Sequence, residues 1–430
     1  MESYNLIQED LQPSLNIGCI GHVSHGKSSI VKALTGIGTA KFDDELEKNM
    51  TIKLGYANAK IWYCNFCKIY FSTNSDIMNK DITCEQCFGG DTCVLKRHVS
   101  FLDCPGHEIL MSTMLNGSAI MDAALIVIAA NEPCPQPQTY EHLASLDMIG
   151  ISKHIIIQNK IDLVTLDRAQ DNYKAIKTFV NNSKACDSPI IPVCTNKKLN
   201  IDILCEYISK INIPEKSIDE PPLMIVVRSF DINKPGTPIK ELQGGVVGGS
   251  LLKGTLGVGQ EIEIRPGVIH KNKNGEFSCV PIITEVISLA SENNSLDCAY
   301  PGGLIAVCSL IDPYCTKGDR LVGNIIGTKG NMPSVYSVIE ISYMVIPRNE
   351  NNEIKIGKIG KNELLRLNIG SLTVDAKVLA LKADLLKLEL VKPACIINKS
   401  KISLSRKLNK NSGWRLYGIG ILCTGNIILE

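Results

Sequence analysis

The 430-residue chain has no excess of charge of either sign and no long apolar run. Its formal net charge of +1 excludes a polybasic tail as the source of nucleic-acid affinity, so any RNA binding must use local patches and shape. The longest apolar runs, such as Ala123 to Ala130, are far shorter than the ~20 residues that cross a bilayer. We therefore expect a soluble protein with no membrane contact. Cysteine is abundant: 17 residues, an odd number, without a secretory signal, indicate a reducing cytoplasmic compartment.

A glycine-rich octapeptide follows the first strand-like run, Asn16 to Ile20. It matches GxxxxGK[ST], the loop that holds nucleotide phosphates where a strand turns into a helix. Its glycines let backbone N–H groups point at phosphate oxygens, its lysine neutralises them, and its serine hydroxyl binds Mg²⁺. Eight residues alone could match by chance, and the motifs downstream reduce that doubt. The predicted nucleotide contacts are Gly21, His22, Val23, Ser24, His25, Gly26, Lys27, Ser28 and Ser29.

A guanine-reading motif follows the buried-strand candidate His154 to Gln158. In NKID, the Asp162 carboxylate can accept two N–H bonds from guanine, Asn159 can also tie this loop to the phosphate loop, and the Lys160 stem can cover the ring. Adenine lacks that pair of donors, so the motif predicts GTP and GDP as ligands. The alternative is an exposed polar turn. The third base-contacting loop is predicted at Cys194, Thr195 and Asn196, where such GTPases usually carry Ser-Ala-Lys.

The DCPGH segment that ends a predicted strand is a candidate sensor of the γ-phosphate. Asp103 is expected to hold Mg²⁺ through water, and Gly106 to offer its N–H to the γ-phosphate. His107 lies where an attacking water must be oriented, so we predict a catalytic rather than a structural role for it. Thr51 is the remaining predicted Mg²⁺ ligand. Loss of the γ-phosphate would release Thr51 and Gly106 together, which turns one bond cleavage into a conformational change.

Four cysteines between Thr51 and the DCPGH segment predict a structural zinc site. The spacing CxxC followed by CxxC lets two short turns supply four thiolates in a tetrahedron that leaves no open position for catalysis. Disulfides are the alternative, and the odd cysteine count without a secretory signal disfavours them. Cys93 is interpreted as an ordinary small apolar residue. The predicted ligands are Cys64, Cys67, Cys84 and Cys87.

The chain is too long for one ordinary core, and its periodicity changes at a proline-rich segment near residues 211–223. Strand-like and helix-like runs alternate before that segment, which predicts an α/β phosphate-loop GTPase domain with a mostly parallel sheet and a zinc-knuckle insertion. Period-two apolar patterns after it predict two β-barrels. The predicted boundaries are 1–213 for the GTPase domain with the insertion at about 62–90, then 221–333 and 334–430 for the barrels.

Three nucleotide motifs followed by two barrels resemble the translational GTPases built like elongation factor Tu. Four further features are similar to the gamma subunit of eukaryotic and archaeal translation initiation factor two. They are the segment Lys48 to Ile61, the cysteine knuckle that follows it, the segment Asn131 to Thr139, and the barrel segment Arg228 to Gly236. The resemblance runs from about residue 14 to the C-terminus.

That resemblance implies a GTP-dependent carrier of methionyl initiator tRNA, with GTP hydrolysis upon start-codon selection. It implies a three-subunit complex with an alpha subunit on the second domain and a beta subunit on the GTPase domain. It also implies contacts with the small ribosomal subunit, a guanine-nucleotide exchange factor and a GTPase activator. Tyr56 is our candidate for stacking on the 3′ base of the tRNA, with core packing as the alternative. Ser24 replaces the Asp of most elongation-type relatives, which puts any ion held by that carboxylate in doubt.

Three other functions fit parts of the pattern. A selenocysteine-type or general elongation factor would share the nucleotide motifs but not the knuckle within the switch. A binding scaffold with a silent GTPase would use nucleotide only to shape a surface, although all the metal, phosphate and water-positioning residues are present. The GTPase partner of a sulfate-activating enzyme shares the domain layout but gives no reason for KLGYANAKI or four paired cysteines.

Overall fold

A computed structural model describes residues 10–39, 51, 53–77, 82–87, 93–346, 358–407 and 413–429. The chain forms two compact units. The first comprises Met1–Glu215 with Glu292–Asn294, and the second comprises Lys216–Ser291 with Ser295–Glu430. The finer domain boundaries drawn from the sequence stay predictions.

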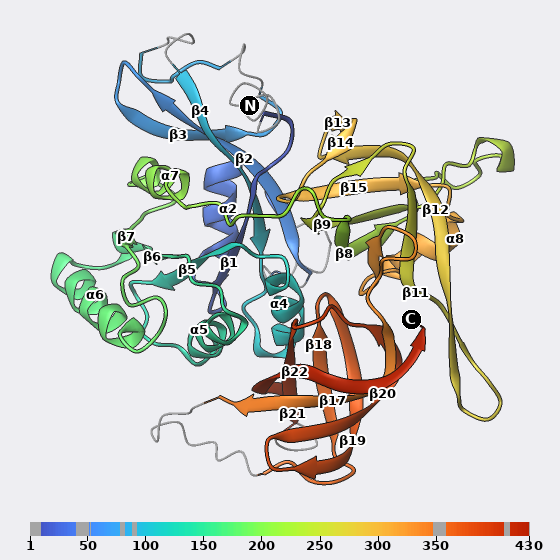
Figure 1. Cartoon of the computed structure of the whole chain (residues 1–430). Coiled ribbons are helices and arrows are strands. Elements are labelled where there is room, and N and C mark those ends of the chain that lie inside the picture. The colour runs from blue at the N-terminus through green and yellow to red at the C-terminus, as the bar shows by residue number, and fades with distance from the viewer. Residues whose placement is uncertain are drawn as a thin grey trace. The chain divides into compact units, whose positions relative to one another are not determined.

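The first unit is built on a seven-stranded sheet in the order β3-β2-β4-β1-β5-β6-β7 (Figure 1). The pairs β4–β1, β1–β5, β5–β6 and β6–β7 are parallel, whereas β2 is antiparallel to both β4 and β3. The prediction of a mostly parallel sheet is confirmed. The strands are β1 (Leu15–Gly21), β2 (Gly55–Cys64), β3 (Ile69–Asn74), β4 (Cys93–Asp103), β5 (Ala123–Ala129), β6 (His154–Asn159) and β7 (Ile190–Pro192).

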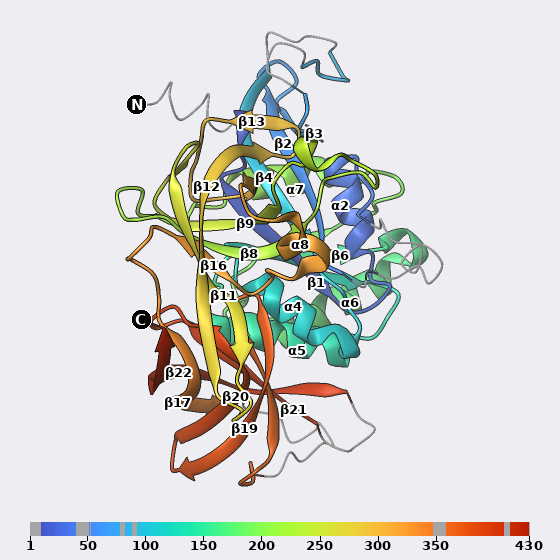
Figure 2. The same ribbon diagram turned by 90° about the vertical axis from the view of Figure 1, so that its right-hand side faces the viewer.

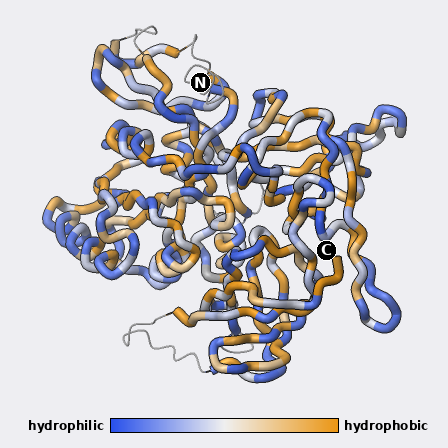
Figure 3. Tube along the Cα trace, viewed as in Figure 1, coloured by the Kyte–Doolittle hydropathy of each residue, from blue (hydrophilic) through white to orange (hydrophobic). Residues whose placement is uncertain are grey.

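Helices cover both faces of this sheet because its central strand is apolar on both sides. Ile17 and Cys19 of β1 belong to a buried cluster with residues of α2 and α7. Gly18 points to the opposite face, where it lies against Met121, and α4 and α5 also contact β1. The tube of α6 is mostly hydrophilic, as expected of a helix at the surface (Figure 3). The helices are α2 (Lys27–Thr35), α4 (Met111–Ser118), α5 (Pro137–Ile149), α6 (Leu166–Val180) and α7 (Ile201–Ser209).

The four-cysteine insertion lies at the antiparallel end of the sheet. Cys64, the last residue of β2, pairs in register with Cys93, the first residue of β4. Next to them, Trp62, Ile82 and Leu95 form a small buried cluster, and Cys93 packs against it as a small apolar residue. The insertion therefore has its own apolar base within the GTPase unit.

The first barrel of the second unit is a ring of six strands in the order β11-β16-β8-β9-β15-β12. The ring closes because β12 pairs back to β11, and these two long strands lie side by side (Figure 2). The short β13 is added outside β12, while β10 and β14 form a separate pair. The strands are β8 (Leu223–Phe230), β9 (Val246–Lys253), β10 (Leu256–Gly257), β11 (Glu261–Lys271), β12 (Phe277–Ser291), β13 (Asn294–Leu296), β14 (Cys298–Ala299), β15 (Leu304–Ser309) and β16 (Ile325–Gly327).

The second barrel is closed in the order β17-β20-β19-β18-β21-β22. Its strands alternate: Leu386, Leu388 and Leu390 of β20 are buried, whereas Lys387 and Glu389 between them are exposed. This pattern is the period-two signal expected of a barrel strand, and both predicted barrels are confirmed. The strands are β17 (Val335–Val345), β18 (Leu364–Ile369), β19 (Leu372–Lys382), β20 (Leu385–Cys395), β21 (Lys401–Lys407) and β22 (Trp414–Leu429).

A buried ion pair joins the first barrel to the segment that leads into the second. Arg265 Nε lies 2.6 Å from Glu263 Oε1, and the two side chains are only 6% and 4% exposed. Arg265 Nη1 donates to the Pro333 carbonyl at 3.3 Å, and the Gly330 N–H donates to Glu263 Oε2 at 3.0 Å. Both charged groups are thus paired with each other and with the linker backbone, as buried charges must be. Among the described residues, no helix is long and apolar enough to span a membrane.

Candidate functional site: a phosphate loop and a candidate magnesium site

The loop between β1 and α2 encloses the ammonium group of Lys27. Its Nζ donates to the backbone carbonyls of Gly21 at 3.1 Å and His22 at 2.8 Å. Burial lowers the pKa of Lys27, and the negative charge of Asp103 partly opposes that shift. A desolvated ammonium at the N-terminus of a helix is well suited to bind an anion.

The outer glycines of the loop are required by both conformation and space. The φ angle is 141° at Gly21 and 95° at Gly26, values that L side chains rarely adopt. A Cβ on Gly21 would lie 2.3 Å from the Val127 carbonyl oxygen, and one on Gly26 would lie 2.3 Å from Asn159 Nδ2. The same Asn159 nitrogen donates to the His25 carbonyl at 2.9 Å. The structure therefore ties the loop after β6 to the phosphate loop, as the sequence predicts.

A pocket of about 280 Å³ opens at this loop. Its volume is close to the lower end of the range typical of small-molecule sites. Every residue that lines it is predicted from the sequence as a nucleotide contact, a Mg²⁺ ligand or the catalytic histidine. These residues are Val23, Ser24, Gly26, Lys27, Ser28, Ser29, Thr51, Gly106, His107 and Lys160.

The predicted base-reading residues lie at the ends of β6 and β7. Asn159 is 1% exposed, and its Oδ1 has no hydrogen-bond partner in the described part of the chain. Asp162 lies in an exposed 3₁₀ turn, Ile161–Leu163, immediately after Lys160. In the third loop Cys194 is buried, and its carbonyl accepts from the Leu199 N–H at 3.0 Å. That contact closes a turn containing Thr195 and Asn196.

Three oxygen-bearing side chains converge beside the pocket. Ser28 Oγ lies 3.1 Å from Thr51 Oγ1, and Thr51 Oγ1 lies 3.4 Å from Asp103 Oδ2. Asp103 is fully buried, and its Oδ1 has no hydrogen-bond partner among the described residues. Burial raises the pKa of Asp103, while hydrogen bonds from Ser28 and other hydroxyls oppose that shift. Hydroxyl and carboxylate oxygens with an unpaired carboxylate oxygen fit the donor preference of Mg²⁺.

The predicted switch residues lie against the phosphate loop. A Cβ on Gly106 would lie 2.3 Å from Lys27 Nζ and 2.8 Å from the Gly21 carbonyl oxygen. His107 is partly exposed at the pocket, where its Nδ1 accepts from the Ile109 N–H at 3.4 Å. The neighbours of Thr51, namely Lys48, Asn49, Met50 and Ile52, lie outside the described residues. Tyr56 is half-buried in β2 opposite Leu102 and is not among the residues that line the pocket.

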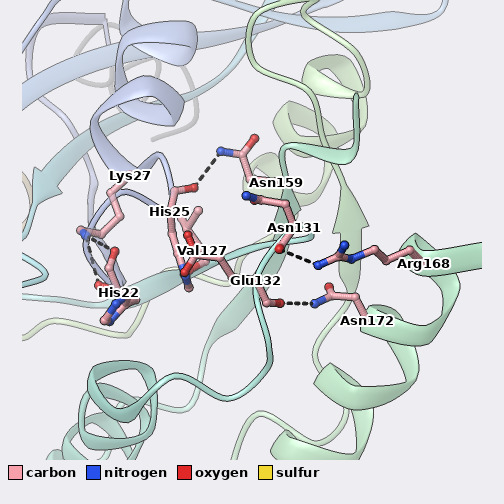
Figure 4. A network of polar contacts seen from close by, with 10 residues as sticks. His22, His25, Lys27, Val127, Asn131, Glu132, Asn159, Arg168 and Asn172 are labelled. Atoms are coloured by element: carbon pink, nitrogen blue, oxygen red, sulfur yellow. Dashed lines mark hydrogen bonds and ion pairs between the residues drawn. The ribbon is translucent and has the colours of Figure 1, made fainter. Parts of the chain in front are cut away.

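A polar network behind the phosphate loop was not predicted from the sequence (Figure 4). His25 is fully buried, with Nδ1 3.1 Å from the Val127 carbonyl and Nε2 3.1 Å from Glu132 Oε2. The Glu132 carbonyl accepts from Asn172 Nδ2 of α6 at 3.2 Å. Burial lowers the pKa of His25, although the Val127 carbonyl and Glu132 favour the protonated ring. Glu132 belongs to the segment Asn131 to Thr139, which resembles the gamma subunit of initiation factor two, but no local spacing indicates its contact with His25.

His142 of α5 also contacts the phosphate loop. Its Nδ1 accepts from the Gly21 N–H at 3.3 Å, which requires the neutral ring with its proton on Nε2. Burial lowers the pKa of His142 to about 3, and the charges of Lys27 and His22 lower it further. No motif contains His142, so sequence reasoning had no signal for it.

The four predicted zinc ligands lie together. The Sγ atoms of Cys64 and Cys87 are 3.6 Å apart, those of Cys67 and Cys84 are 3.9 Å apart, and all four lie within 4.8 Å of one another. A disulfide requires about 2.05 Å, so neither of these pairs is joined by one. Sulfurs bound tetrahedrally to zinc at about 2.3 Å would be roughly 3.8 Å apart, which matches both distances. The cluster therefore has the composition and size of a Cys₄ zinc site.

Comparison with known proteins identifies the family. Residues 12–214 match the elongation factor Tu GTP binding domain, and residues 337–422 match the C-terminal region of initiation factor eIF2 gamma. The chain is 48% identical over 429 residues to eukaryotic translation initiation factor 2 subunit 3 of Drosophila melanogaster, covering 97% of this chain and 90% of that protein. This chain belongs to the eIF2 gamma-subunit family. It is also 47% identical over 421 residues to the subunit gamma of Schizosaccharomyces pombe, covering 95% of this chain and 93% of that protein.

Solved structures of elongation factors share the fold of this eIF2 gamma-type chain. The bacterial selenocysteine-specific factor EF-Sec superposes with a TM-score of 0.69 at 20% identity, covering 95% of this chain and 58% of that one. SelB from Methanococcus maripaludis in complex with GppNHp also gives 0.69, at 19% identity, covering 97% of this chain and 80% of that one. At such identities the likeness concerns the fold alone. The family match decides for an initiation-type translational GTPase over the elongation-type and sulfate-activating alternatives.

Proposed function

We propose that this chain is the GTP-binding core of a three-subunit initiation factor that carries methionyl initiator tRNA to the small ribosomal subunit. The observation that carries the proposal is the identity of nearly half the residues over almost the whole chain to two eIF2 gamma-type subunits. The presence of ten predicted nucleotide, magnesium and catalytic residues around one pocket supports it. GTP favours tRNA binding in this scheme, and hydrolysis upon start-codon selection favours release.

The nucleotide would be held from both ends. Gly26 and its neighbours offer backbone N–H groups to the phosphates, and Lys27 exchanges its two carbonyl contacts for phosphate oxygens. Asn159, with its unpaired Oδ1, and Asp162 read the guanine edge, while Lys160 covers the ring. Cys194, Thr195 and Asn196 border the base through their backbone. Discrimination against adenine then arises because Asp162 would lose both of its N–H partners.

Ser28, Thr51 and Asp103 would hold Mg²⁺, whose charge neutralises the phosphates and the negative charge that develops during phosphoryl transfer. Gly106 offers its N–H to the γ-phosphate, and its missing Cβ leaves room for that approach. His107, at the edge of the pocket, orients the attacking water. Loss of the γ-phosphate then frees Thr51 and Gly106 from a common partner, and both switch segments relax together.

The Cys₄ cluster would bind one structural zinc ion that braces the insertion. A closed shell of four thiolates has no position for substrate, so the site contributes stability rather than chemistry. The apolar base around Trp62 and Ile82 fits that role, because it anchors the insertion to the sheet independently of the nucleotide.

The partners are proposed from the family. They are alpha and beta subunits of the same factor, the small ribosomal subunit, a guanine-nucleotide exchange factor and a GTPase activator, all in the cytoplasm. Tyr56 is proposed to stack on the 3′ base of the tRNA. Tyr56→Ala should then weaken initiator tRNA binding by about tenfold, since stacking on one base contributes about 1–3 kcal/mol, and Tyr56→Phe should not. Equal binding by the Ala variant and the parent would rule out this role.

The function is tested with the purified protein, alone and with its alpha and beta subunits. Binding of methionyl initiator tRNA and of methionyl elongator tRNA is measured in a GTP analogue and in GDP. We expect tighter binding of the initiator species in the GTP analogue. Equal binding in both nucleotides would instead indicate a scaffold with a silent switch, and no preference for the initiator would indicate an elongation-type carrier.

A further inference from the structure

A threonine outside every nucleotide motif contacts the carboxylate of Asp103, one of the proposed Mg²⁺ ligands. Thr39 lies four residues beyond the end of α2 and is only 6% exposed. Its Oγ1 donates to Asp103 Oδ2 at 2.5 Å, a short charge-assisted hydrogen bond. Thr51 reaches the same oxygen only at 3.4 Å. Thr39 therefore contacts this carboxylate oxygen more closely than Thr51 does.

The space around Thr39 is built for that contact. Gly55, the first residue of β2, pairs in register with Asp103, the last residue of β4. A Cβ on Gly55 would lie 2.7 Å from Thr39 Cβ and 3.3 Å from Asp103 Cβ. The missing side chain of Gly55 is thus the room in which the threonine lies against the carboxylate. Any larger residue there would push Thr39 away from Asp103.

The two oxygens of Asp103 then differ. Oδ2 is tied to the hydroxyls, whereas Oδ1 is buried and has no hydrogen-bond partner in the described part of the chain. A carboxylate held through one oxygen loses rotational freedom, so its other oxygen keeps one direction. A carboxylate oxygen fixed in advance holds the water shell of a hard cation more tightly than one that must be ordered upon binding.

We propose that Thr39 is a positioning residue that sets the Mg²⁺ affinity of the site by holding the Asp103 carboxylate. The inference rests on the metal site proposed above. Thr51 is expected to leave Asp103 for the metal in the GTP state and to move away after hydrolysis. Thr39 remains with Asp103 throughout, so its effect is greatest on the Mg²⁺ requirement of the GDP-bound protein, where Thr51 no longer contributes.

The test compares Thr39→Val, which keeps the shape and removes the hydroxyl, with Thr39→Ser, which keeps the hydroxyl. Thr35→Val is the matched control, because Thr35 is also buried but its hydroxyl contacts backbone groups, donating to the Val31 carbonyl at 2.8 Å and accepting from the Ile37 N–H at 3.0 Å. The release rate of a fluorescent GDP is measured against free Mg²⁺, and the GDP affinity is measured in excess EDTA. Outer partners of metal ligands typically change metal affinity 10–100-fold.

We expect Thr39→Val to need about 10–100-fold more Mg²⁺ for half-maximal slowing of GDP release, with the affinity in EDTA within about twofold of the parent. Thr39→Ser should restore the parent midpoint, and Thr35→Val should not change it. An unchanged midpoint in Thr39→Val, or an equal loss of affinity with and without Mg²⁺, would overturn the inference.

If GDP release from the parent protein does not depend on Mg²⁺, the proposed metal site is wrong. That result is distinct from an unchanged Mg²⁺ midpoint in Thr39→Val, which contradicts only the role of Thr39. If Thr39→Val does not fold, Gly55→Ala perturbs the same contact from the other strand. Its expected result is the same rise in the Mg²⁺ midpoint, and a parent-like midpoint would again count against the role of Thr39.

Discussion

Mild acid should loosen the GTPase sheet through His142. This ring is 1% exposed in α5, and its Nδ1 accepts from the first N–H of the phosphate loop. Burial lowers its pKa to about 3 from an ordinary value of 6.5. The folded protein therefore keeps the ring neutral over the whole range in which the unfolded chain takes up a proton. The stability that His142 contributes is complete above about pH 6.5 and is lost as the pH falls from there toward 3.

The size of the loss follows from linkage. Each pH unit between the two pKa values changes the free energy of unfolding by about 1.4 kcal/mol, so the fall from pH 7 to pH 5 costs about 2 kcal/mol. His142→Gln removes the titration while its amide oxygen can still accept from Gly21. The variant should therefore lack that ~2 kcal/mol of pH dependence. Burial also lowers the pKa of His154 to about 4, but His154 is present in both proteins and cancels.

Hydrogen exchange of the buried amides of β1, corrected for the intrinsic effect of pH on exchange, reports the opening free energy of this sheet alone. That restriction matters because a chain with several domains does not unfold in one step. His270→Gln is the matched control, since His270 is exposed and its replacement should change nothing. If the parent and His142→Gln lose the same opening free energy between pH 7 and pH 5, His142 is not kept neutral by the fold and the reasoning fails.

Three further outcomes are expected. Removal of zinc by a chelator should change the fluorescence of Trp62, which packs at the base of the cysteine cluster, and unchanged emission upon loss of one zinc per chain would contradict this. Gly106→Ala should weaken binding of a GTP analogue at least about tenfold and GDP less, because its Cβ overlaps the phosphate loop; equal losses would contradict the switch role. Glu263→Gln should destabilise the barrel unit by about 3–5 kcal/mol in denaturant melts, because the charge of Arg265 stays buried without its counter-charge. Glu261→Gln, in an exposed pair, should change it by less than about 1 kcal/mol.

The motifs located the nucleotide loop because their physical requirements are local. A loop that aims several N–H groups at one anion needs glycines at set positions, and Gly21 and Gly26 have the positive φ angles that this demands. The cysteine pairs succeed for the same reason, since each short turn supplies two thiolates. Such patterns are visible in a few consecutive residues.

The supporting residues were not visible in this way. Thr39, Glu132 and His142 act on residues 64, 107 and 121 positions away, and a single threonine, glutamate or histidine in a helix or loop carries no spacing that indicates a distant partner. Barrel closure is another case. Alternating residues predicted strands in the second half of the chain, but the pairing of β11 with β12 that closes the ring depends on how the sheet coils in space.

The second strand of the GTPase unit is a single mechanical element with a site at each end. β2 begins at Gly55, four residues after Thr51, and ends at Cys64, a member of the cysteine cluster. Ten residues at about 3.3 Å each span roughly 30 Å, and β2 pairs with β4 from Gly55 to Cys64 with one irregularity between Ile61 and Trp62. One hydrogen-bonded strand therefore supports both the cysteine cluster and the segment beside the predicted nucleotide pocket, so the two sites share a single structural element.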